Sequence, residues 1–278
     1  MPNRNRAEGW KHAKLTGHDN EKLVAELTKA DNGIQKRLLE CAHLKDVEIT
    51  DIQCGGLCET DVDCILGGKT KSKTDMWLQL SNGKKLNVSI KKDENGQVFL
   101  IGIDRFIDGF EKQYNIKIDS EVKRAIELYF GSASDVIEII RKYSDKNKTL
   151  EMKKHRLVAE TLKKYDEKLY RNMLSWFNNN MDSIFDFCFS RGLAYHQSDW
   201  ADIVWYINLV GENKFDKMIY LPEMKKGIQS NAVYGTRNGG STIQLPFGFV
   251  QWHSPRKIIP GSIQFHHSFE KMCNLIDC

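Results

Sequence analysis

The sequence predicts a mixed α/β fold of the α+β kind, in which helices flank a mixed β-sheet. Three observations predict it. Strand-like alternation of apolar and polar residues surrounds an Asn-Gly turn within residues 73–91, helical periodicity runs through residues 119–143 and 149–191, and the last forty residues contain short β-branched and aromatic segments separated by prolines. Helical and strand-rich regions that follow one another in this way are typical of layered α+β folds, here with a β-rich C-terminal subdomain.

The composition places few limits on function. A chain of 278 residues with 41% apolar residues can bury a sizeable core as one domain or as two closely packed ones. We expect a boundary in the polar segment 144–148, which gives parts 1–147 and 148–278. No apolar stretch of about 18 residues predicts a membrane span, and no apolar region follows the basic start at residues 1–6, so a cytoplasmic protein is expected. The net charge of +4 is too small to indicate a partner.

Helices are expected in four regions. The first begins at an N-cap, Asp19 or Asn20, and continues through an apolar stripe at Leu23, Val24 and Leu27. A short helix is expected over 106–114, and a longer one over 119–143. The region 149–191 is helical with a break near residues 178–180. Extended segments are expected at 97–103, 201–210, 218–221, 241–245, 247–253 and 262–267.

The hairpin in residues 73–91 has a register that its apolar face should decide, because a slip of one residue turns every side chain to the other face. A two-residue Asn-Gly turn would mismatch the two apolar faces. A three-residue loop at 82–84 with a bulge aligns them and places Asp75 opposite Lys91. This register pairs Leu80 with Leu86, Leu78 with Val88 and Met76 with Ile90.

The Asp75–Lys91 pair has the chemistry of a phosphodiester-hydrolysing site. Mg²⁺ needs one or two carboxylates and keeps several waters, so Asp75 with the backbone carbonyl of Ile90 could hold the ion. Lys91 would orient the attacking water and stabilise developing charge. Ser89 cannot supply a carboxylate, so a second acid must come from elsewhere; Glu21 is our choice, and Glu26 is the alternative.

A simpler interpretation stays open for each of these residues. Asp75 and Lys91 could form a surface ion pair across a hairpin, which contributes little to stability. Glu21 could merely favour the N-terminal end of its helix electrostatically. Cys54, Cys58 and Cys64 could bind zinc, but their C-x3-C spacing has no second well-formed pair.

The C-terminal region carries side chains that can hydrogen-bond with base edges in the major groove of DNA, into which a two-stranded ribbon fits. Adjacent residues on a strand point to opposite faces, so His266 and His267 cannot readily share one metal ion. A glycine-rich loop at 234–240 could reach into a groove or be an ordinary turn. The candidate DNA-binding residues are Lys73, Arg237, Asn238, Gln244, Gln251, His253, Arg256, Lys257, Gln264 and His266.

The motif formed by Thr74-Asp75, the hairpin and Ser89-Ile90-Lys91 resembles the PD-(D/E)xK nuclease superfamily. The glycine-rich approach from Gly67 and the segments that follow the lysine are similar to small type II restriction endonucleases of the MspI kind, with sparse matches from about residue 16 to the end. Those enzymes have Asn or Gln two residues before the lysine, where this chain has Ser89.

The resemblance implies a catalytic set of Asp75, Ser89, Lys91 and Glu21, and a nuclease core followed by a DNA-recognition subdomain. It implies a type II restriction endonuclease that uses Mg²⁺ to cut double-stranded DNA at a short site. Such an enzyme would act as a monomer in the bacterial cytoplasm, paired functionally with a DNA methyltransferase of the same specificity. The alternatives are a repair or nicking nuclease with the same core, and a non-catalytic DNA-binding protein.

Overall fold

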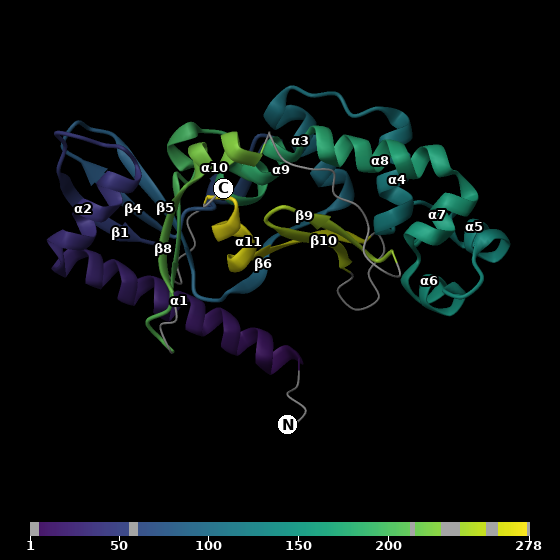
Figure 1. The fold of residues 1–278 in the computed structure, drawn as a ribbon, viewed down its shortest axis with the longest axis horizontal. Coiled ribbons are helices and arrows are strands. Elements are labelled where there is room, and N and C mark those ends of the chain that lie inside the picture. The colour runs from purple at the N-terminus through teal and green to yellow at the C-terminus, as the bar shows by residue number, and fades with distance from the viewer. Residues whose placement is uncertain (1–5, 56–60, 212–214, 229–239, 254–260, 277–278) are drawn as a thin grey trace. The chain divides into compact units, whose positions relative to one another are not determined.

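The fold belongs to the mixed α/β class that the sequence predicts. The computed structural model describes residues 6–55, 61–211, 215–228, 240–253 and 261–276 (Figure 1). The chain forms two compact units. The first contains Met1–Glu94 and Phe189–Met224, and the second contains Asn95–Cys188 and Lys225–Cys278.

The first unit is built on a five-stranded sheet in the order β1-β4-β5-β7-β8. Its strands are β1 (Ile49–Cys54), β4 (Met76–Leu80), β5 (Lys85–Lys91), β7 (Ile203–Ile207) and β8 (Asp216–Tyr220). All neighbours are antiparallel except β5 and β7, which are parallel. A two-stranded sheet, β2 (Asp61–Asp63) with β3 (Lys69–Lys71), also belongs to this unit.

The parallel pair explains why the units do not divide at the expected boundary, 147/148. Parallel neighbours need a long crossover connection. The segment between β5 and β7 includes residues 95–188 of the second unit, and the pairing returns residues 189–224 to the first unit.

Helix α1 (Arg6–Ala30) begins well before the expected N-cap at Asp19 or Asn20, so that prediction is wrong. The side chain of Asn20 is used elsewhere: Nδ2 donates to the carbonyl of Ile207 at 2.9 Å, and Oδ1 accepts from the amide of Leu209 at 2.6 Å. Helix α2 (Asn32–Cys41) follows, and its N-cap Asp31 accepts from the amides of Gly33 and Ile34.

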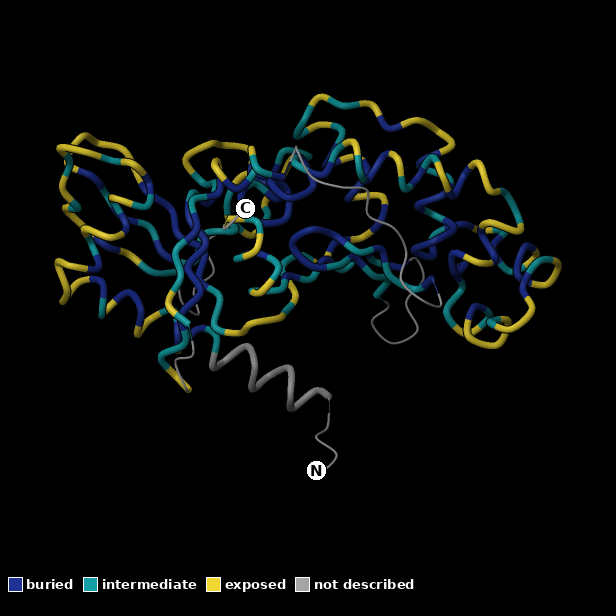
Figure 2. Tube along the Cα trace, in the orientation of Figure 1, coloured by how far each residue is buried: buried dark blue, intermediate teal, exposed yellow. Residues whose placement is uncertain are grey.

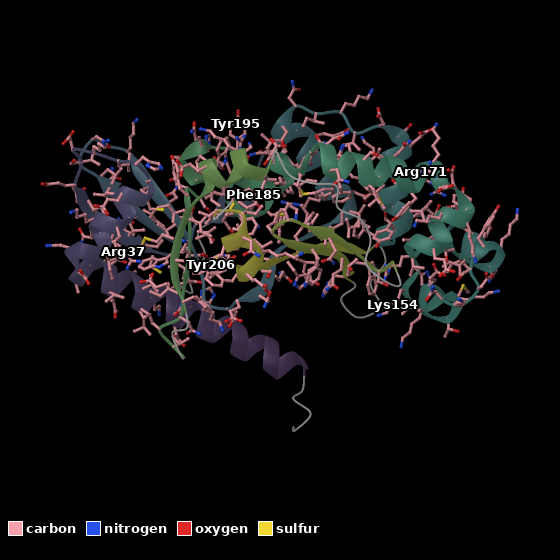
Figure 3. The ribbon with its side chains drawn as sticks, in the orientation of Figure 1. Arg37, Lys154, Arg171, Phe185, Tyr195 and Tyr206 are labelled. Atoms are coloured by element: carbon pink, nitrogen blue, oxygen red, sulfur yellow. The ribbon has the colours of Figure 1, made fainter. Side chains whose placement is uncertain are left out.

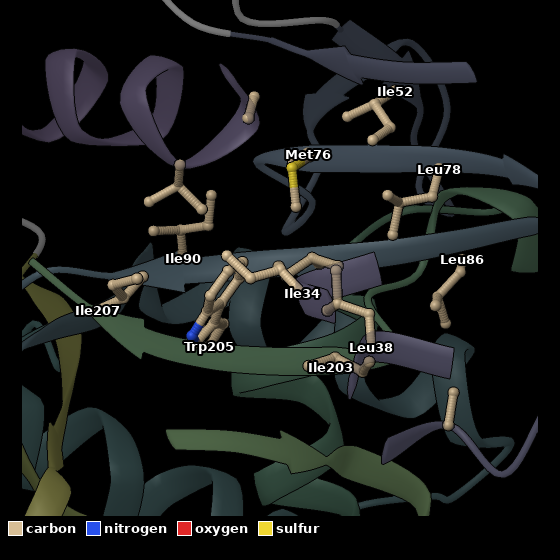
Figure 4. Close-up of a cluster of buried hydrophobic side chains, with 14 of the residues drawn as sticks. Ile34, Leu38, Ile52, Met76, Leu78, Leu86, Ile90, Ile203, Trp205 and Ile207 are labelled. Atoms are coloured by element: carbon tan, nitrogen blue, oxygen red, sulfur yellow. The ribbon is translucent and has the colours of Figure 1, made fainter. Parts of the chain in front are cut away.

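The core of the first unit lies between helices α1 and α2 and one face of the large sheet (Figure 4). Val24 and Leu38 are completely buried, as are Met76, Leu78 and Val88 on the hairpin strands. Burial of such side chains stabilises a fold by about 1.5–3 kcal/mol each. The apolar face predicted for the hairpin is therefore the face that packs against the helices.

The hairpin register differs from the expected one by two residues. Met76 pairs with Val88 and Leu78 with Leu86, so the predicted Leu80–Leu86, Leu78–Val88 and Met76–Ile90 pairs are wrong. The amide of Asp75 also donates to the carbonyl of Val88, so the expected position of Asp75 directly opposite Lys91 is wrong as well. The amide of Leu80 donates to the carbonyl of Lys84, and the three turn residues are 81–83, with Gly83 at φ 80°. A shift of two residues keeps each side chain on its predicted face, because side chains alternate with a period of two.

The second unit contains a four-stranded antiparallel sheet in the order β6-β11-β10-β9. Its strands are β6 (Asn95–Gly102), β9 (Thr242–Leu245), β10 (Gly248–His253) and β11 (Ser262–Ser268), which agree closely with the expected segments. The partnership of β6 with β11 joins residues far apart in the sequence. Strands β9 and β11 alternate between buried and intermediate residues, so one face of the sheet packs inward, and Figure 2 colours the two kinds of residue differently.

Helices make up most of the rest of the second unit, and α3 and α4 are among those that pack on its sheet. Rings of Phe106 and Phe265 lie 5.7 Å apart, and those of Phe99 and Phe187 lie 5.1 Å apart. The helices are α3 (Ile103–Tyr114), α4 (Ser120–Phe130), α5 (Val136–Tyr143), α6 (Lys148–Lys154), α7 (Ala159–Tyr165), α8 (Glu167–Asn179), α9 (Met181–Asp186) and α11 (Phe269–Asn274), with α10 (Leu221–Ile228) crossing the boundary between the units.

The single helix expected over 119–143 is two helices. Gly131 ends α4 at φ 93°, a left-handed conformation that glycine adopts at little cost. In the polar segment that follows α5, Ser144 is buried and donates a hydrogen bond to the fully buried Glu151, whereas residues 145, 146 and 148 are exposed.

Asp202, just before β7, supplies a pH-dependent contribution to stability. Burial raises the pKa of this carboxyl to about 6 from a usual 3.8, although its carboxylate accepts a hydrogen bond from the amide of Asn87 at 2.9 Å. Between these two values the folded protein binds a proton that the unfolded chain releases. The stability that this bound proton adds is therefore fully present below the usual pKa of 3.8, and it is lost as the pH rises through the folded-state pKa of about 6.

We predict that Asp202→Asn raises the free energy of unfolding at pH 8 relative to wild type. This gain should be larger at pH 8 than at pH 4 by an amount on the order of 1–3 kcal/mol. Urea unfolding of both proteins at the two pH values measures this difference. The variant Asp108→Asn, at an exposed carboxylate on α3, is the control. A difference between wild type and Asp202→Asn that does not change with pH would contradict the prediction.

Candidate functional site

Asp75 is held at the start of β4 by the loop that precedes it. The hydroxyl of Ser72 accepts from the amide of Thr74 at 3.0 Å and donates to the carbonyl of Asp199 at 2.9 Å. The amide of Asp75 donates to the carbonyl of Val88 on β5 at 2.9 Å. Both strands and the loop before β7 therefore fix the carboxylate at the open end of the hairpin, where the sequence predicts it.

The Asp75 carboxylate and the Lys91 ammonium converge on this end of the sheet, with Ser89 between them. Oδ2 of Asp75 accepts from the amide of Ile90 at 2.7 Å and from the hydroxyl of Ser89 at 3.1 Å. Nζ of Lys91 donates to that hydroxyl at 2.7 Å and lies 3.7 Å from Asp75 Oδ2. Ser89 is thus a neutral bridge between the two charges.

Two more features define this cluster of polar groups around Asp75 and Lys91. The carbonyl of Ile90 accepts from Nζ of Lys91 at 3.2 Å, so it belongs to the same cluster. On the other side of β5, Lys91 is in register with Tyr206 of β7. The side chain of Tyr206, labelled in Figure 3, is fully buried. The side chains of Lys91 and Asp75 are only 19% and 26% exposed, so water screens their interaction less than that of a surface pair.

Glu21 completes the cluster from helix α1. Its pKa is raised, chiefly by burial and then by the negative charge of Asp75, while a hydrogen bond from His18 and the charge of Lys91 oppose the shift. Glu21 is therefore close enough to feel both charges of the hairpin. The alternative acid, Glu26, is an exposed residue further along α1, and no contact connects it with the hairpin charges.

His18 is a member of the cluster that the sequence analysis missed. Its Nδ1 lies 3.0 Å from Oε2 of Glu21, and the residue is only 8% exposed. The spacing of three between the two residues places them on one helical face, a signal that was present in the sequence. Recognising it required knowing that α1 begins before residue 18.

The donor set fits a divalent cation that prefers oxygen. Asp75 and Glu21 are two partly buried carboxylates whose proximity disfavours the charge on Glu21, and the Ile90 carbonyl adds a neutral oxygen. Among the described residues no group of three His, Cys, Asp or Glu side chains could hold a metal ion. Mg²⁺ needs only one or two carboxylates with water, which is the donor set that Asp75 and Glu21 offer.

The predicted DNA-binding residues divide into three groups. Gln251, Gln264 and His266 lie on the polar face of the second unit's sheet, with Gln244 and His253 on the same face of β9 and β10. Lys73 lies in the first unit, half-buried beside Gly192. Arg237, Asn238, Arg256 and Lys257 lie outside the described residues, as does Cys58.

Imidazole and amide groups on that polar face form a defined network. His266 stacks on Phe249 with ring centroids 4.4 Å apart, and its pKa is lowered, first by burial and then by the charge of His253. Its Nε2 lies 3.2 Å from Nε2 of Gln251. His267 is buried on the opposite face of β11, so the two histidines do not meet.

Comparison with known proteins finds similarity among solved structures. No family model matches the sequence, and no curated protein matches it. Among solved structures, the chain is similar to the restriction endonuclease MspI in complex with its cognate DNA, with 13% sequence identity, a TM-score of 0.48, and coverage of 84% of this chain and 77% of that one.

The two hydrogen bonds of Asn20 should be essential for holding α1 at the sheet. We predict that Asn20→Ala lowers the free energy of unfolding by about 1–3 kcal/mol for each backbone group left unpaired. Asn180→Ala, which removes a bond to a carbonyl one turn earlier in its own segment, should cost less. Chemical denaturation of the two variants compares these losses, and equal losses would contradict the assigned role of Asn20.

The raised pKa of Glu21 predicts that protons compete with a bound cation. Because Glu21 keeps its proton to a higher pH than an ordinary glutamate, Mg²⁺ affinity should increase as the pH rises to 7.5. Glu21→Gln should weaken Mg²⁺ binding at pH 7.5 by at least about tenfold and flatten its pH dependence. Titration calorimetry measures both effects, with Glu26→Gln as the control; an unchanged affinity in Glu21→Gln would remove Glu21 from the site.

Proposed function

We propose that this protein is a Mg²⁺-dependent endonuclease of the PD-(D/E)xK kind, which hydrolyses phosphodiester bonds of double-stranded DNA at a short site. The observation that carries this proposal is the convergence of Asp75, Lys91 and Glu21 from two strands and a helix. A structural ion pair would need only the first two. The third group, the Glu21 carboxylate, is disfavoured in its charged form by burial and by Asp75, and groups perturbed in this way are concentrated at functional sites.

Asp75, Glu21 and the Ile90 carbonyl are the groups that would hold Mg²⁺. The bound ion would lower the pKa of a water molecule and neutralise charge on the phosphate. The amide of Ile90 and the hydroxyl of Ser89 fix one oxygen of Asp75, which orients the carboxylate before any cation binds. His18 holds one oxygen of Glu21 in the same way.

Lys91 orients the attacking water and stabilises the negative charge that develops on the phosphate in the transition state. Its ammonium has three protons, of which two are directed to Ser89 and the Ile90 carbonyl, so one remains for substrate or water. Ser89 acts as a positioning residue, because its hydroxyl accepts from Lys91 while it donates to Asp75.

The polar face of the second unit supports sequence-specific cleavage, because a row of amides and imidazoles suits base edges better than phosphates. A site-specific nuclease endangers the DNA of its own cell unless the sites are modified. We therefore place the enzyme in a restriction–modification system of the bacterial cytoplasm, where a methyltransferase of the same specificity protects the DNA without binding the nuclease. It acts as a monomer in this proposal.

Substitution of the two hairpin charges tests catalysis directly. Asp75→Asn and Lys91→Ala should each reduce Mg²⁺-dependent cleavage of duplex DNA by at least about 10²-fold, because each removes a group aimed at the reacting phosphate. DNA binding without Mg²⁺ should be nearly unchanged. Gel-based cleavage and fluorescence anisotropy measure the two quantities.

The chain offers a matched control one residue away, since Lys92 and Asp93 form a neighbouring ion pair with 3.3 Å between Nζ and Oδ2. Lys92→Ala and Asp93→Asn should retain cleavage. Full activity in Asp75→Asn would overturn the proposal. Sequencing the ends produced from long unmethylated DNA separates the possible activities: discrete ends support restriction, random or single-strand cuts favour a repair or nicking nuclease, and no cuts favour a non-catalytic binder.

A further inference from the structure

The polar face of the four-stranded sheet in the second unit has a composition that identifies the kind of base pair it can recognise. Its side chains alternate with buried ones along β9, β11 and the first part of β10, and the residues of β6 that are paired with them across the sheet belong to the same face. Among the described residues this face contains amides, imidazoles, hydroxyls, one aromatic ring and one aliphatic side chain. The residues are Asn95, Gln97, Leu100, Thr242, Gln244, Phe249, Gln251, His253, Ser262, Gln264, His266 and Ser268.

Three glutamines on this face are joined in a chain whose direction is fixed at one end. An amide nitrogen can only donate, so Nε2 of Gln251 donates to Nε2 of His266, which must be an acceptor. The same nitrogen donates to Oε1 of Gln264 at 3.0 Å. Nε2 of Gln264 in turn donates to Oε1 of Gln97 at 2.6 Å, so every amide has one orientation.

This direction decides what each amide can still offer. Both protons of the Gln251 amide are used within the chain. Gln264 retains one N–H and one lone pair of Oε1, because it makes one bond with each of its two glutamine neighbours. One donor beside one acceptor is the complement of the N6 amino group and N7 of adenine in the major groove. The two neighbours hold this amide in place, which lowers the entropy cost of a specific contact.

An aliphatic side chain lies directly beside that amide. Leu100 on β6 is in register with Gln264 on β11 and is 38% exposed, although it is a large hydrophobic residue. Directly paired residues have Cβ atoms about 4.5–5.5 Å apart. An apolar side chain at this position can contact the C5-methyl group of thymine, which is exposed in the major groove of an A·T base pair.

The charged side chains that read other bases are absent from this face in the described residues. Guanine is read by Arg or Lys on O6 and N7, and cytosine by Asp or Glu on N4. None of these four residue types is among the twelve residues of the face. A charged group that contacts this face from outside it, Lys271 of α11, is bound to Gln244 and to two backbone carbonyls.

We propose that this face reads an A·T base pair, with the Gln264 amide on adenine and the Leu100 side chain on the methyl group of the paired thymine. The inference rests on the proposed function, because it takes double-stranded DNA as the substrate. It adds that the recognition site contains at least one A·T pair that is essential for binding.

Binding measured without Mg²⁺ tests this inference independently of cleavage. The full-length protein is first used to select duplexes from a randomised library in the presence of EDTA, and the selected site is then synthesised with single-atom changes. We expect an A·T pair at one position in all selected duplexes. N6-methyladenine or 7-deazaadenine at that position should weaken binding by about tenfold to a hundredfold, and uracil in place of its thymine by about fourfold.

Two variants connect the base pair to the proposed residues. Gln264→Ala should lose the discrimination between A·T and G·C at that position, and Leu100→Ala should bind the thymine and uracil duplexes equally. Gln79→Ala, and Leu150→Ala at a comparably exposed leucine, are the controls and should behave as wild type. Far-ultraviolet circular dichroism checks that each variant is folded.

The outcomes separate the two proposals. A wild-type protein that selects A·T-containing duplexes but does not cleave them with Mg²⁺ contradicts the proposed function and supports the base reading. A protein that cleaves sites made only of G·C pairs supports the function and overturns the base reading. Failure to bind any duplex, or unchanged discrimination in Gln264→Ala, also overturns it.

Discussion

The two-way hydrogen bond between Asn20 and the end of β7 is the constraint on which the candidate site depends. It joins residues 187 positions apart, and it fixes α1 with respect to the sheet at 2.9 and 2.6 Å. Glu21 follows Asn20 immediately, so the same contact brings a carboxylate to the hairpin charges. Without it the hairpin would carry an ordinary aspartate–lysine pair, which contributes little.

The charge balance of the cluster depends on Ser89, which lies between Asp75 and Lys91. Ser89 is almost completely buried and neutral, so the site holds two carboxylates rather than three. Three buried carboxylates around one lysine would repel strongly before a cation arrived. A hydroxyl keeps Lys91 directed at Asp75 without this cost, and it leaves the second acid to α1.

The two units have different chemistry. Ionisable groups gather at the strand ends of the first, and neutral amides and imidazoles cover the open face of the second. Charge suits bond cleavage at a phosphate, whereas a directed amide network suits discrimination between bases. The long crossover between β5 and β7 lets a single chain contain both. Residues 95–188 supply β6 and most helices of the second unit, the chain then returns to complete the first unit, and residues 225–278 add strands β9, β10 and β11 to the second.

The sequence by itself determined the mixed α/β class, the strands near the C-terminus, and the faces of the hairpin, because side-chain periodicity is a local property. Alternation also placed Asp75 and Lys91 at one end of the hairpin, despite a register error of two residues that left each side chain on its predicted face. Only the tertiary structure decided that Asn20 would bind β7 rather than cap a helix, that His18 would join Glu21, and that β6 would pair with β11. Each of these features depends on partners more than a hundred residues away, or on a helix boundary set by such partners. The hydrogen bonds and packing that these distant partners supply are stronger than local propensity.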